Sequence, residues 1–189
     1  MGRCGEPLTW GCRQLIIGLT GLARSGKSTI AAELERHHGF KRVRFADPLK
    51  NMLRVLGLCE AEIEGILKEE PCSKLCGQTP RLAMQTLGTE WGRSIIGSDI
   101  WVNAWARLVA EVDGDTVAED CRFENEAIAL HDHGGVVVQV LRPGLIQGSH
   151  VSEAGVPAHL INFIVRNRGS LGSIPAMART IIETARVCG

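Results

Sequence analysis

Three observations predict a three-layer α/β fold with a mostly parallel central sheet flanked by helices. Short apolar runs of strand length alternate with longer amphipathic segments along the chain. The run VVVQVL at 136–141 is rich in β-branched residues, as is typical of a buried parallel strand. Charged or glycine-rich turns follow the predicted strands, at the sheet edge where α/β proteins bind their ligands.

The first strand, loop and helix lie between residues 14 and 40. LIIGL at 15–19 is a strand candidate, and a helical pattern of apolar residues runs up to Gly39. Between them, GLARSGKS at 21–28 fits the pattern G-x-x-x-x-G-K-[ST]. A loop of this kind between a strand and a helix binds the phosphates of a nucleoside triphosphate, so we predict a P-loop with ATP and Mg²⁺ as cofactors.

The chemistry of the P-loop assigns a role to most of its residues. Gly21 and Gly26 let the backbone turn tightly and bring its N–H groups close to a phosphate. Lys27 supplies a positive charge for the β- and γ-phosphates, and the Ser28 hydroxyl is a magnesium ligand. The predicted nucleotide-binding residues of the loop are Gly21, Ala23, Arg24, Ser25, Gly26, Lys27, Ser28 and Thr29.

Helical patterns dominate the region from 41 to 114. A strand at 42–46 precedes Asp47-Pro48, with Asp47 as N-cap and Pro48 at the first helical position. The elements expected after it are a helix to Gly57, a short acidic helix at 61–70, a loop at 71–78, a helix capped by Thr79 that reaches Ile95, and a helix capped by Ser98-Asp99 that reaches Val109. Gly88 and Gly92 inside the third helix predict close packing or a break, since each costs about 1 kcal/mol relative to Ala.

Strands and helices also alternate in the second half of the chain. The predicted elements are a strand at 116–120, a helix at 123–131, a strand at 136–141, a loop or lid at about 143–158, a strand at 159–165 and a helix at 174–187. The domain organisation is therefore a flexible lead-in at 1–13 and a single domain at 14–189, with a helical insert at about 48–112.

Composition limits the partners and the location of the protein. Its 189 residues include 21 Lys+Arg and 21 Asp+Glu, so the net charge of zero argues against broad binding to nucleic acid or membrane surfaces. No apolar run is long enough to span a bilayer. These features predict a protein of the cytoplasm. The seven cysteines are expected to be reduced, and Cys72 and Cys76 would need further ligands to hold zinc.

Several charged or polar residues directly follow predicted strands and are expected to share one edge of the sheet. They are the P-loop, Asp47, Asp120 with Arg122, Arg142 and Asn167. Asp47 serves as a helix cap, as an acid that holds a molecule accepting phosphate from ATP, or as both. Asp120 binds magnesium, directly or through water, or it caps the following helix.

With those residues in view, the chain resembles the deoxynucleoside monophosphate kinases of bacterial viruses, within the P-loop nucleoside monophosphate kinase group. The matching segments are GLARSGKST at 21–29, FADPLK at 45–50, GQTPRLAMQTLGTEWGR at 77–93, DIWVNAW at 99–105, DCRFENEA at 120–127, GGVVVQVLRPG at 135–144 and HVSE at 150–153. The resemblance implies a P-loop kinase fold and transfer of the γ-phosphate of ATP to a deoxynucleoside monophosphate. It also allows for a homodimer, and it makes 48–112 the acceptor-binding insert. The cytoplasm that it implies is that of a bacterium or of an infected host.

The resemblance also implies roles in the acceptor site. Arg81 grips the 5′-phosphate of the acceptor, unless it is simply a solvated surface residue. Gln85 lies on the same helix face and reads a base edge or caps a surface. Glu90 and Trp91 shape the nucleoside pocket, although Trp91 also suits the core.

Phosphoryl transfer needs positive charge around the transferring group, so we predict Lys27, Arg122 and Arg142 as catalytic residues. By the resemblance, Asn125 and Glu126 contact the substrate or orient Arg122, and Asn167 belongs to a turn that cradles adenine. His150, Ser152 and Glu153 touch substrate when the lid closes, or they are ordinary loop residues.

Three alternatives stay open at the level of the sequence. The first is a P-loop kinase of another small acceptor, such as a coenzyme A precursor. The second is an ATP-binding sensor that transfers no phosphate. The third is a metal-binding regulator built on Cys72 and Cys76, which predicts stoichiometric zinc.

Overall fold

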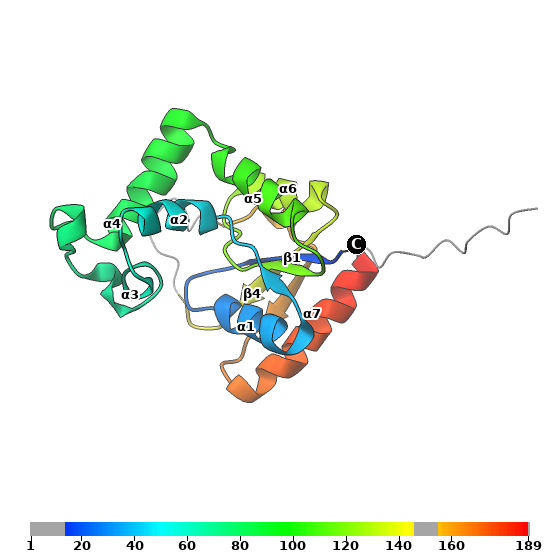
Figure 1. Cartoon of the computed structure of the whole chain (residues 1–189). Coiled ribbons are helices and arrows are strands. Elements are labelled where there is room, and N and C mark those ends of the chain that lie inside the picture. The colour runs from blue at the N-terminus through cyan, green and yellow to red at the C-terminus, as the bar shows by residue number, and fades with distance from the viewer. Residues whose placement is uncertain (1–13, 146–154, 189) are drawn as a thin grey trace, which may run out of the picture.

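Five parallel strands form the centre of the structure, a computed structural model that describes residues 14–145 and 155–188 (Figure 1). The strand order is β2-β3-β1-β4-β5, and every neighbouring pair is parallel. The strands are β1 (Ile16–Thr20), β2 (Lys41–Arg42), β3 (Thr116–Ala118), β4 (Val136–Leu141) and β5 (Phe163–Arg166). The predicted three-layer α/β fold is confirmed.

Helices cover both faces of this sheet (Figure 1). Helices α1 (Lys27–His38) and α7 (Ile174–Cys188) pack on one face, and α5 (Ile100–Ala110) and α6 (Glu124–Asp132) pack on the other. Alternate residues of β1 supply both cores, because Ile17 and Leu19 face α1 and α7 whereas Ile16 faces α5 and α6. Burial on both faces explains why the strand reads as an unbroken apolar run.

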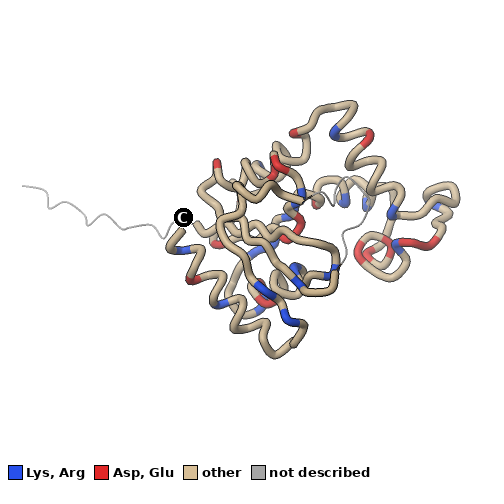
Figure 2. The backbone as a smooth tube through the Cα atoms, turned by 180° about the vertical axis from the view of Figure 1, so that it is seen from behind, with Lys and Arg blue, Asp and Glu red and all other residues tan. Residues whose placement is uncertain are grey.

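Short helices between β2 and α5 project away from the sheet (Figure 1). They are α2 (Asp47–Val55), α3 (Glu60–Ile63), η1 (Ile66–Glu69), η2 (Ser73–Leu75), α4 (Pro80–Gln85) and η3 (Thr86–Ile96). Leu53, Leu58 and Ile63 form a small core of their own here. The acidic positions of 60–70 gather in the outer part of this region (Figure 2).

The helix that begins at Pro80 changes type halfway. Thr79 caps it as predicted, because its Oγ1 accepts a hydrogen bond from the Leu82 N–H at 3.2 Å. After Gln85 the chain continues as the π-helix η3, whose last turn includes a bond from Gly97 N to Gly92 O at 2.9 Å. The two glycines that the sequence marked for close packing or a break both lie in this π-helix.

Gly92 leaves room for the Trp101 ring, and this contact predicts the effect of a substitution. A Cβ atom at position 92 would lie 2.7 Å from atoms of that ring, whereas one at position 88 would lie 3.4 Å from Leu49. We expect Gly92→Ala to lower the free energy of unfolding by about 1–3 kcal/mol, as overpacking does. Gly88→Ala is the matched control and should cost less than about 1 kcal/mol. Equal costs in urea unfolding would contradict this account.

Three predicted strands are shorter than expected, and one of them is β3, which ends at Ala118 rather than at 120. Strand β2 ends at Arg42 rather than 46, because side chains bind the next backbone groups: Trp105 Nε1 donates to Val43 O at 3.0 Å. The predicted strand at 159–165 begins instead with the short helix η5 (Ala158–Leu160), and β5 starts at Phe163. The Asn162 side chain bonds the Val137 N–H at 2.7 Å just before β5 begins.

Three helix predictions are also corrected. Asp47 is the first residue of α2 rather than its N-cap, and its carboxylate accepts bonds from Arg44 N and Nε at 2.9 and 2.7 Å. Asp99 occupies the N-cap position of α5, but its side chain accepts a bond from Asn125 Nδ2 at 2.7 Å and does not cap the helix. The predicted helix at 61–70 is divided at Gly65 into α3 and η1.

Within residues 14–145 and 155–188, no helix is both long and apolar enough to cross a bilayer. His150, Ser152 and Glu153 lie outside the described residues, as does the central part of the predicted lid.

Candidate active site

The P-loop joins β1 to α1, and its two glycines have conformations that other residues rarely adopt. Gly21 has φ 133° and Gly26 has φ 105°. A Cβ atom at Gly21 would collide with the Val140 carbonyl oxygen, and one at Gly26 would collide with the Asn167 side chain. The Ser25 hydroxyl is buried without a hydrogen-bond partner among the described residues. A tight glycine turn with a spare buried donor fits the phosphates of ATP.

Lys27 lies over this loop. Its side chain is largely buried, and its Nζ donates to the carbonyl oxygens of Gly21 at 2.7 Å and Leu22 at 2.8 Å. The ammonium group is therefore held against the loop that the motif assigns to the triphosphate.

The ends of β4 and β5 brace the P-loop from the other side. Asn167 is buried, and its Nδ2 donates to Ser25 O at 2.8 Å while its Oδ1 accepts from Gly169 N at 2.9 Å. Arg142 is exposed, and its Nη1 donates to Arg24 O at 3.3 Å. Asn167 thus positions the loop through its side chain, and Arg142 lies at the loop's edge.

A buried acid lies beside the start of α1. Arg42 connects the two, since its Nη2 donates to Ser28 O at 3.4 Å and its Nη1 to Glu119 Oε1 at 3.4 Å. Glu119 Oε2 is buried and has no hydrogen-bond partner among the described residues. Burial and the nearby Asp120 raise the pKa of Glu119, while Arg42 lowers it. An unpaired carboxylate oxygen and the exposed Ser28 hydroxyl are oxygen ligands of the kind that Mg²⁺ prefers.

The sequence analysis named Asp120, and not its neighbour Glu119, as the acid for magnesium. The Asp120 oxygens accept bonds from Phe45 N at 3.1 Å and Ala46 N at 2.9 Å, so this carboxylate fastens the turn at 45–46 to the end of β3. Burial raises the pKa of Asp120, which those backbone bonds oppose. The magnesium role of Asp120 stays a prediction. Glu119 follows the same strand one residue earlier, and this was the signal that could have revealed it.

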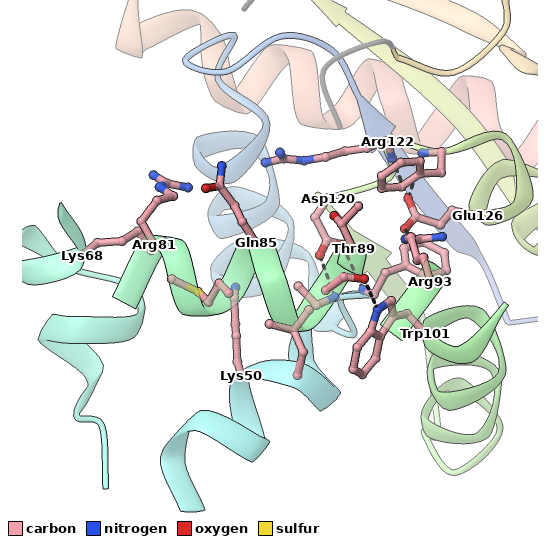
Figure 3. A pocket seen from close by; sticks show the side chains of 16 residues that line it. Lys50, Lys68, Arg81, Gln85, Thr89, Arg93, Trp101, Asp120, Arg122 and Glu126 are labelled. Carbon is pink, nitrogen blue, oxygen red and sulfur yellow. Dashed lines mark hydrogen bonds and ion pairs between the residues drawn. The ribbon is translucent and has the colours of Figure 1, made fainter. Parts of the chain in front are cut away.

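A cavity of about 200 Å³ lies between the sheet edge and the projecting helices (Figure 3). Its apolar wall includes Phe45, Ala46, Leu49, Met84, Trp101 and Phe123. Its polar and charged lining residues are Lys50, Lys68, Arg81, Gln85, Thr89, Arg93, Asp120, Arg122 and Glu126. Four predicted residues, Arg81, Gln85, Arg122 and Glu126, are therefore brought together with Asp120. An apolar wall with a cationic rim suits a ligand that joins an aromatic base to a phosphate.

Four side chains from one helical rod line this cavity in a row: Arg81, Gln85, Thr89 and Arg93. In an α-helix, residues four apart drift around the axis because one turn takes 3.6 residues. The wider π-helical turn, with its i→i+5 bonds, reverses that drift. The change from α4 to η3 thus keeps all four side chains on the cavity. Their regular spacing was the signal that could have revealed Arg93.

Cations dominate the rim of the cavity. Arg122 extends across it toward Gln85 and Arg81 (Figure 3). Arg81 Nε contacts Glu69 at 2.8 Å, and Lys50 Nζ contacts Glu64 at 2.8 Å. Both carboxylates come from the segment that links α3 to α4. They pair with only two of the cations on the rim, so the protein itself neutralises the rim only in part.

Glu126 binds the backbone N–H of Arg122 and the side chain of Arg93. Its Oε2 accepts bonds from Arg122 N at 2.7 Å and Phe123 N at 3.0 Å, and its Oε1 accepts one from Arg93 Nη2 at 2.5 Å. The Arg93 guanidinium also lies 3.9 Å from the centre of the Phe123 ring. This arrangement agrees with the predicted role of Glu126 in orienting Arg122.

The environment of Glu126 predicts a pH effect on stability. Burial and the Asp120 charge raise its pKa from 4.5 to about 7, although the Arg122 N–H and Arg93 oppose the shift. Because the folded protein holds this proton more tightly than the unfolded chain does, stability is lost as pH rises between about 4.5 and 7. We expect wild type to lose about 3 kcal/mol relative to Glu126→Gln across this window. Parallel curves in denaturant unfolding at several pH values would contradict the shift.

Four predicted acceptor residues do not line the cavity. Asp47 binds Arg44, and Asn125 donates to Ser98 O at 3.0 Å and to Asp99. Glu90 is exposed. Trp91 packs on the Trp101 ring, with the ring centres 6.3 Å apart, and does not reach the cavity. Their contact with substrate stays a prediction that the described cavity does not favour.

The cysteine pair offers little to a metal. Cys72 is buried with its Sγ 3.2 Å from Glu62 Oε1, and Cys76 is exposed. Among residues 14–145 and 155–188, no group of three or more His, Cys, Asp or Glu side chains could hold a metal ion. The zinc regulator considered above therefore lacks a complete ligand set in this part of the chain.

A parallel sheet with a P-loop after its central strand and a cation-rimmed cavity beside it defines a P-loop kinase. A sequence model described as "Deoxynucleotide monophosphate kinase" matches residues 77–177. A provisionally assigned deoxynucleotide monophosphate kinase of Acanthamoeba polyphaga mimivirus is 34% identical over 155 residues, which cover 74% of this chain and 80% of that protein. The chain belongs to the deoxynucleotide monophosphate kinase family.

A second curated relative agrees with this family. The deoxynucleoside-5′-monophosphate kinase of Escherichia phage T5 is 32% identical over 99 residues, which cover 48% of this chain and 40% of that protein. The alignment to this relative is thus partial on both sides.

Solved structures support the fold alone. The shikimate kinase of Aquifex aeolicus has a TM-score of 0.52 and 13% identity, with 92% of this chain and 99% of that chain covered. The APS kinase of Mycobacterium tuberculosis, solved with AMPPNP and APS, has a TM-score of 0.51 and 15% identity, with 92% and 98% covered.

Proposed function

We propose that this protein transfers the γ-phosphate of ATP to a deoxynucleoside monophosphate. A phosphate oxygen of the acceptor forms a bond to the γ-phosphorus, and the bond from that phosphorus to the β,γ-bridging oxygen breaks. The products are a deoxynucleoside diphosphate and ADP. The observation that carries the proposal is the combination of the P-loop with the cation-rimmed, aromatic-walled cavity in a chain of this family.

On the donor side, the loop at 21–29 holds the triphosphate. Gly21 and Gly26 let backbone N–H groups approach it, and Lys27 offsets the charge that develops on the transferring group. Arg142 adds a second cation from the edge of the loop, where it contacts Arg24. Asn167 keeps the loop in this shape through its bond to Ser25.

Magnesium, when bound, neutralises phosphate charge and orients the β- and γ-phosphates. The residues proposed to hold it are Ser28 and an acid at the end of β3. The spare Glu119 Oε2 supports Glu119 for this role, and the burial of Asp120 against the 45–46 turn supports a bracing role for that residue.

On the acceptor side, the helical insert at about 48–112 supplies most of the cavity. The apolar wall that includes Trp101 and Phe123 suits a base. The Arg122 side chain extends across the cavity toward Arg81 (Figure 3), and this supports a phosphate subsite between the two arginines. Gln85 is placed to bond a base edge or the sugar. Closure of the lid at about 143–158 would exclude water and so suppress ATP hydrolysis.

The direct test is an ADP-release assay with ATP and Mg²⁺, offering dAMP, dCMP, dGMP, dTMP and the four ribonucleotides in turn. Turnover with one or more deoxynucleotides is expected. A folded protein that binds ATP but turns over none of them would overturn the proposal. Turnover with a coenzyme A precursor instead would favour the kinase of another small acceptor, and ATP binding without any product would favour the sensor.

The homodimer allowed by the resemblance stays a prediction. Exposed apolar side chains on η3, Trp91, Ile95 and Ile96, offer a surface for it.

A further inference from the structure

Lys68 is a cation at the acceptor cavity that belongs neither to the P-loop nor to the residues that follow the strands. Lys68 belongs to η1, the short helix that precedes the loop before α4, and it lines the cavity together with Arg81 and Lys50. The match to the family's sequence model begins at residue 77, so Lys68 lies before the matched segment.

The surroundings of Lys68 are unfavourable for a charge. Its side chain is half-buried, and burial and the neighbouring Arg81 lower its pKa, while Glu64 raises it. Among the described residues it forms no hydrogen bond or ion pair within 4 Å. By contrast, Lys50 has Glu64 at 2.8 Å and Arg81 has Glu69 at 2.8 Å.

Lys68 and Arg81 are near enough for the Arg81 charge to lower the pKa of Lys68, and Figure 3 draws the ends of both side chains at the part of the rim toward which Arg122 extends. Among the described residues, Arg81 bonds Glu69 through its Nε alone, so the two terminal nitrogens of the guanidinium keep their donors. Two cations with unused donors on one rim and a third opposite form a site for a dianion.

We propose that Lys68 and Arg81 together form the subsite for the acceptor phosphate, with Arg122 opposite, and that Lys68 discriminates nucleotides from nucleosides. This inference rests on the proposed function, because a deoxynucleoside monophosphate is the ligand that joins a dianionic phosphate to a base of the size that the apolar wall accepts. The acceptor phosphate carries the attacking oxygen but is not itself transferred, so Lys68 would contribute mainly by binding this phosphate and holding it in position.

The test compares Lys68→Met with Lys74→Met. Lys74 lies on η2 in the same region and pairs with Glu62 at 2.8 Å, but it does not line the cavity. We expect Lys68→Met to raise the KM for the monophosphate about tenfold or more, as the loss of a charge-assisted hydrogen bond does, and to change kcat little. Lys74→Met should leave both values unchanged, and Lys68→Arg should restore most of the affinity.

Calorimetric binding separates this inference from the proposed function. dAMP, dCMP, dGMP and dTMP are each compared with the deoxynucleoside that lacks the phosphate. Lys68→Met should weaken the monophosphate about tenfold and leave the deoxynucleoside unaffected. An equal effect on both ligands, or none on either, would overturn the subsite. If wild type turns over no deoxynucleotide but binds it in a Lys68-dependent way, the proposed reaction fails and the phosphate subsite stands.

Discussion

Lys27→Ala is expected to abolish turnover through the donor. Its ammonium group is held over the P-loop by the carbonyl oxygens of Gly21 and Leu22, where the β- and γ-phosphates would lie. Removing a fixed charge from a transferring phosphoryl group costs about 10³-fold or more in kcat. The measurement is kcat from ADP release, together with the Kd of a non-hydrolysable ATP analogue.

The matched control for this variant is Lys41→Ala. Lys41 is an exposed lysine of β2, and its side chain forms no hydrogen bond among the described residues. It should keep wild-type kinetics. A Lys27→Ala protein that is folded and retains more than about a tenth of wild-type kcat would show that the loop does not handle the transferring phosphate.

Arg81→Ala is expected to abolish turnover through the acceptor. Its guanidinium lies on the cavity rim with two terminal nitrogens available to a phosphate, and a bidentate charge-assisted contact is lost with it. We expect the KM for the deoxynucleoside monophosphate to rise about 10²-fold, so that turnover disappears at ordinary substrate concentrations. The Kd of the ATP analogue should not change.

Arg179→Ala serves as the control, because Arg179 is an exposed arginine of α7 on the other side of the sheet. Steady-state kinetics with each substrate varied in turn separate the two effects. Equal losses of ATP binding in Arg81→Ala and Lys27→Ala would refute the division between an acceptor site and a donor site.

Much of the fold follows from local sequence. Apolar runs, the P-loop pattern and the Thr79-Pro80 helix start identified β1, α1 and α4, because each depends on neighbouring residues. The rule that parallel strands carry ligands at their carboxyl ends placed Asp120, Arg122 and Asn167 at the same edge. The family resemblance supplied the acceptor, and the matched relatives agree with it.

The elements that the sequence misjudged depend on distant side chains. Strand β2 stops early because Trp105 and Asp120 bind the backbone at 43–46, and both partners are more than 60 residues away. Asp47 pairs with Arg44 instead of capping α2 because a network of ionic contacts around Arg44 also includes Glu64. Local capping rules cannot anticipate partners that only the folded chain brings close.

The sequence by itself determined the class of protein, the P-loop and the succession of strands and helices along the chain. Only the tertiary structure decided which charges share a cavity. It turned η3 into a π-helix, so that Arg93 lies in line with Arg81, and it brought Lys68 beside Arg81 from an earlier helix. It also gave Glu119 a spare buried oxygen and linked this residue to Ser28 through Arg42. These are through-space relations between segments far apart in the chain, and periodicity within one segment carries no information about them.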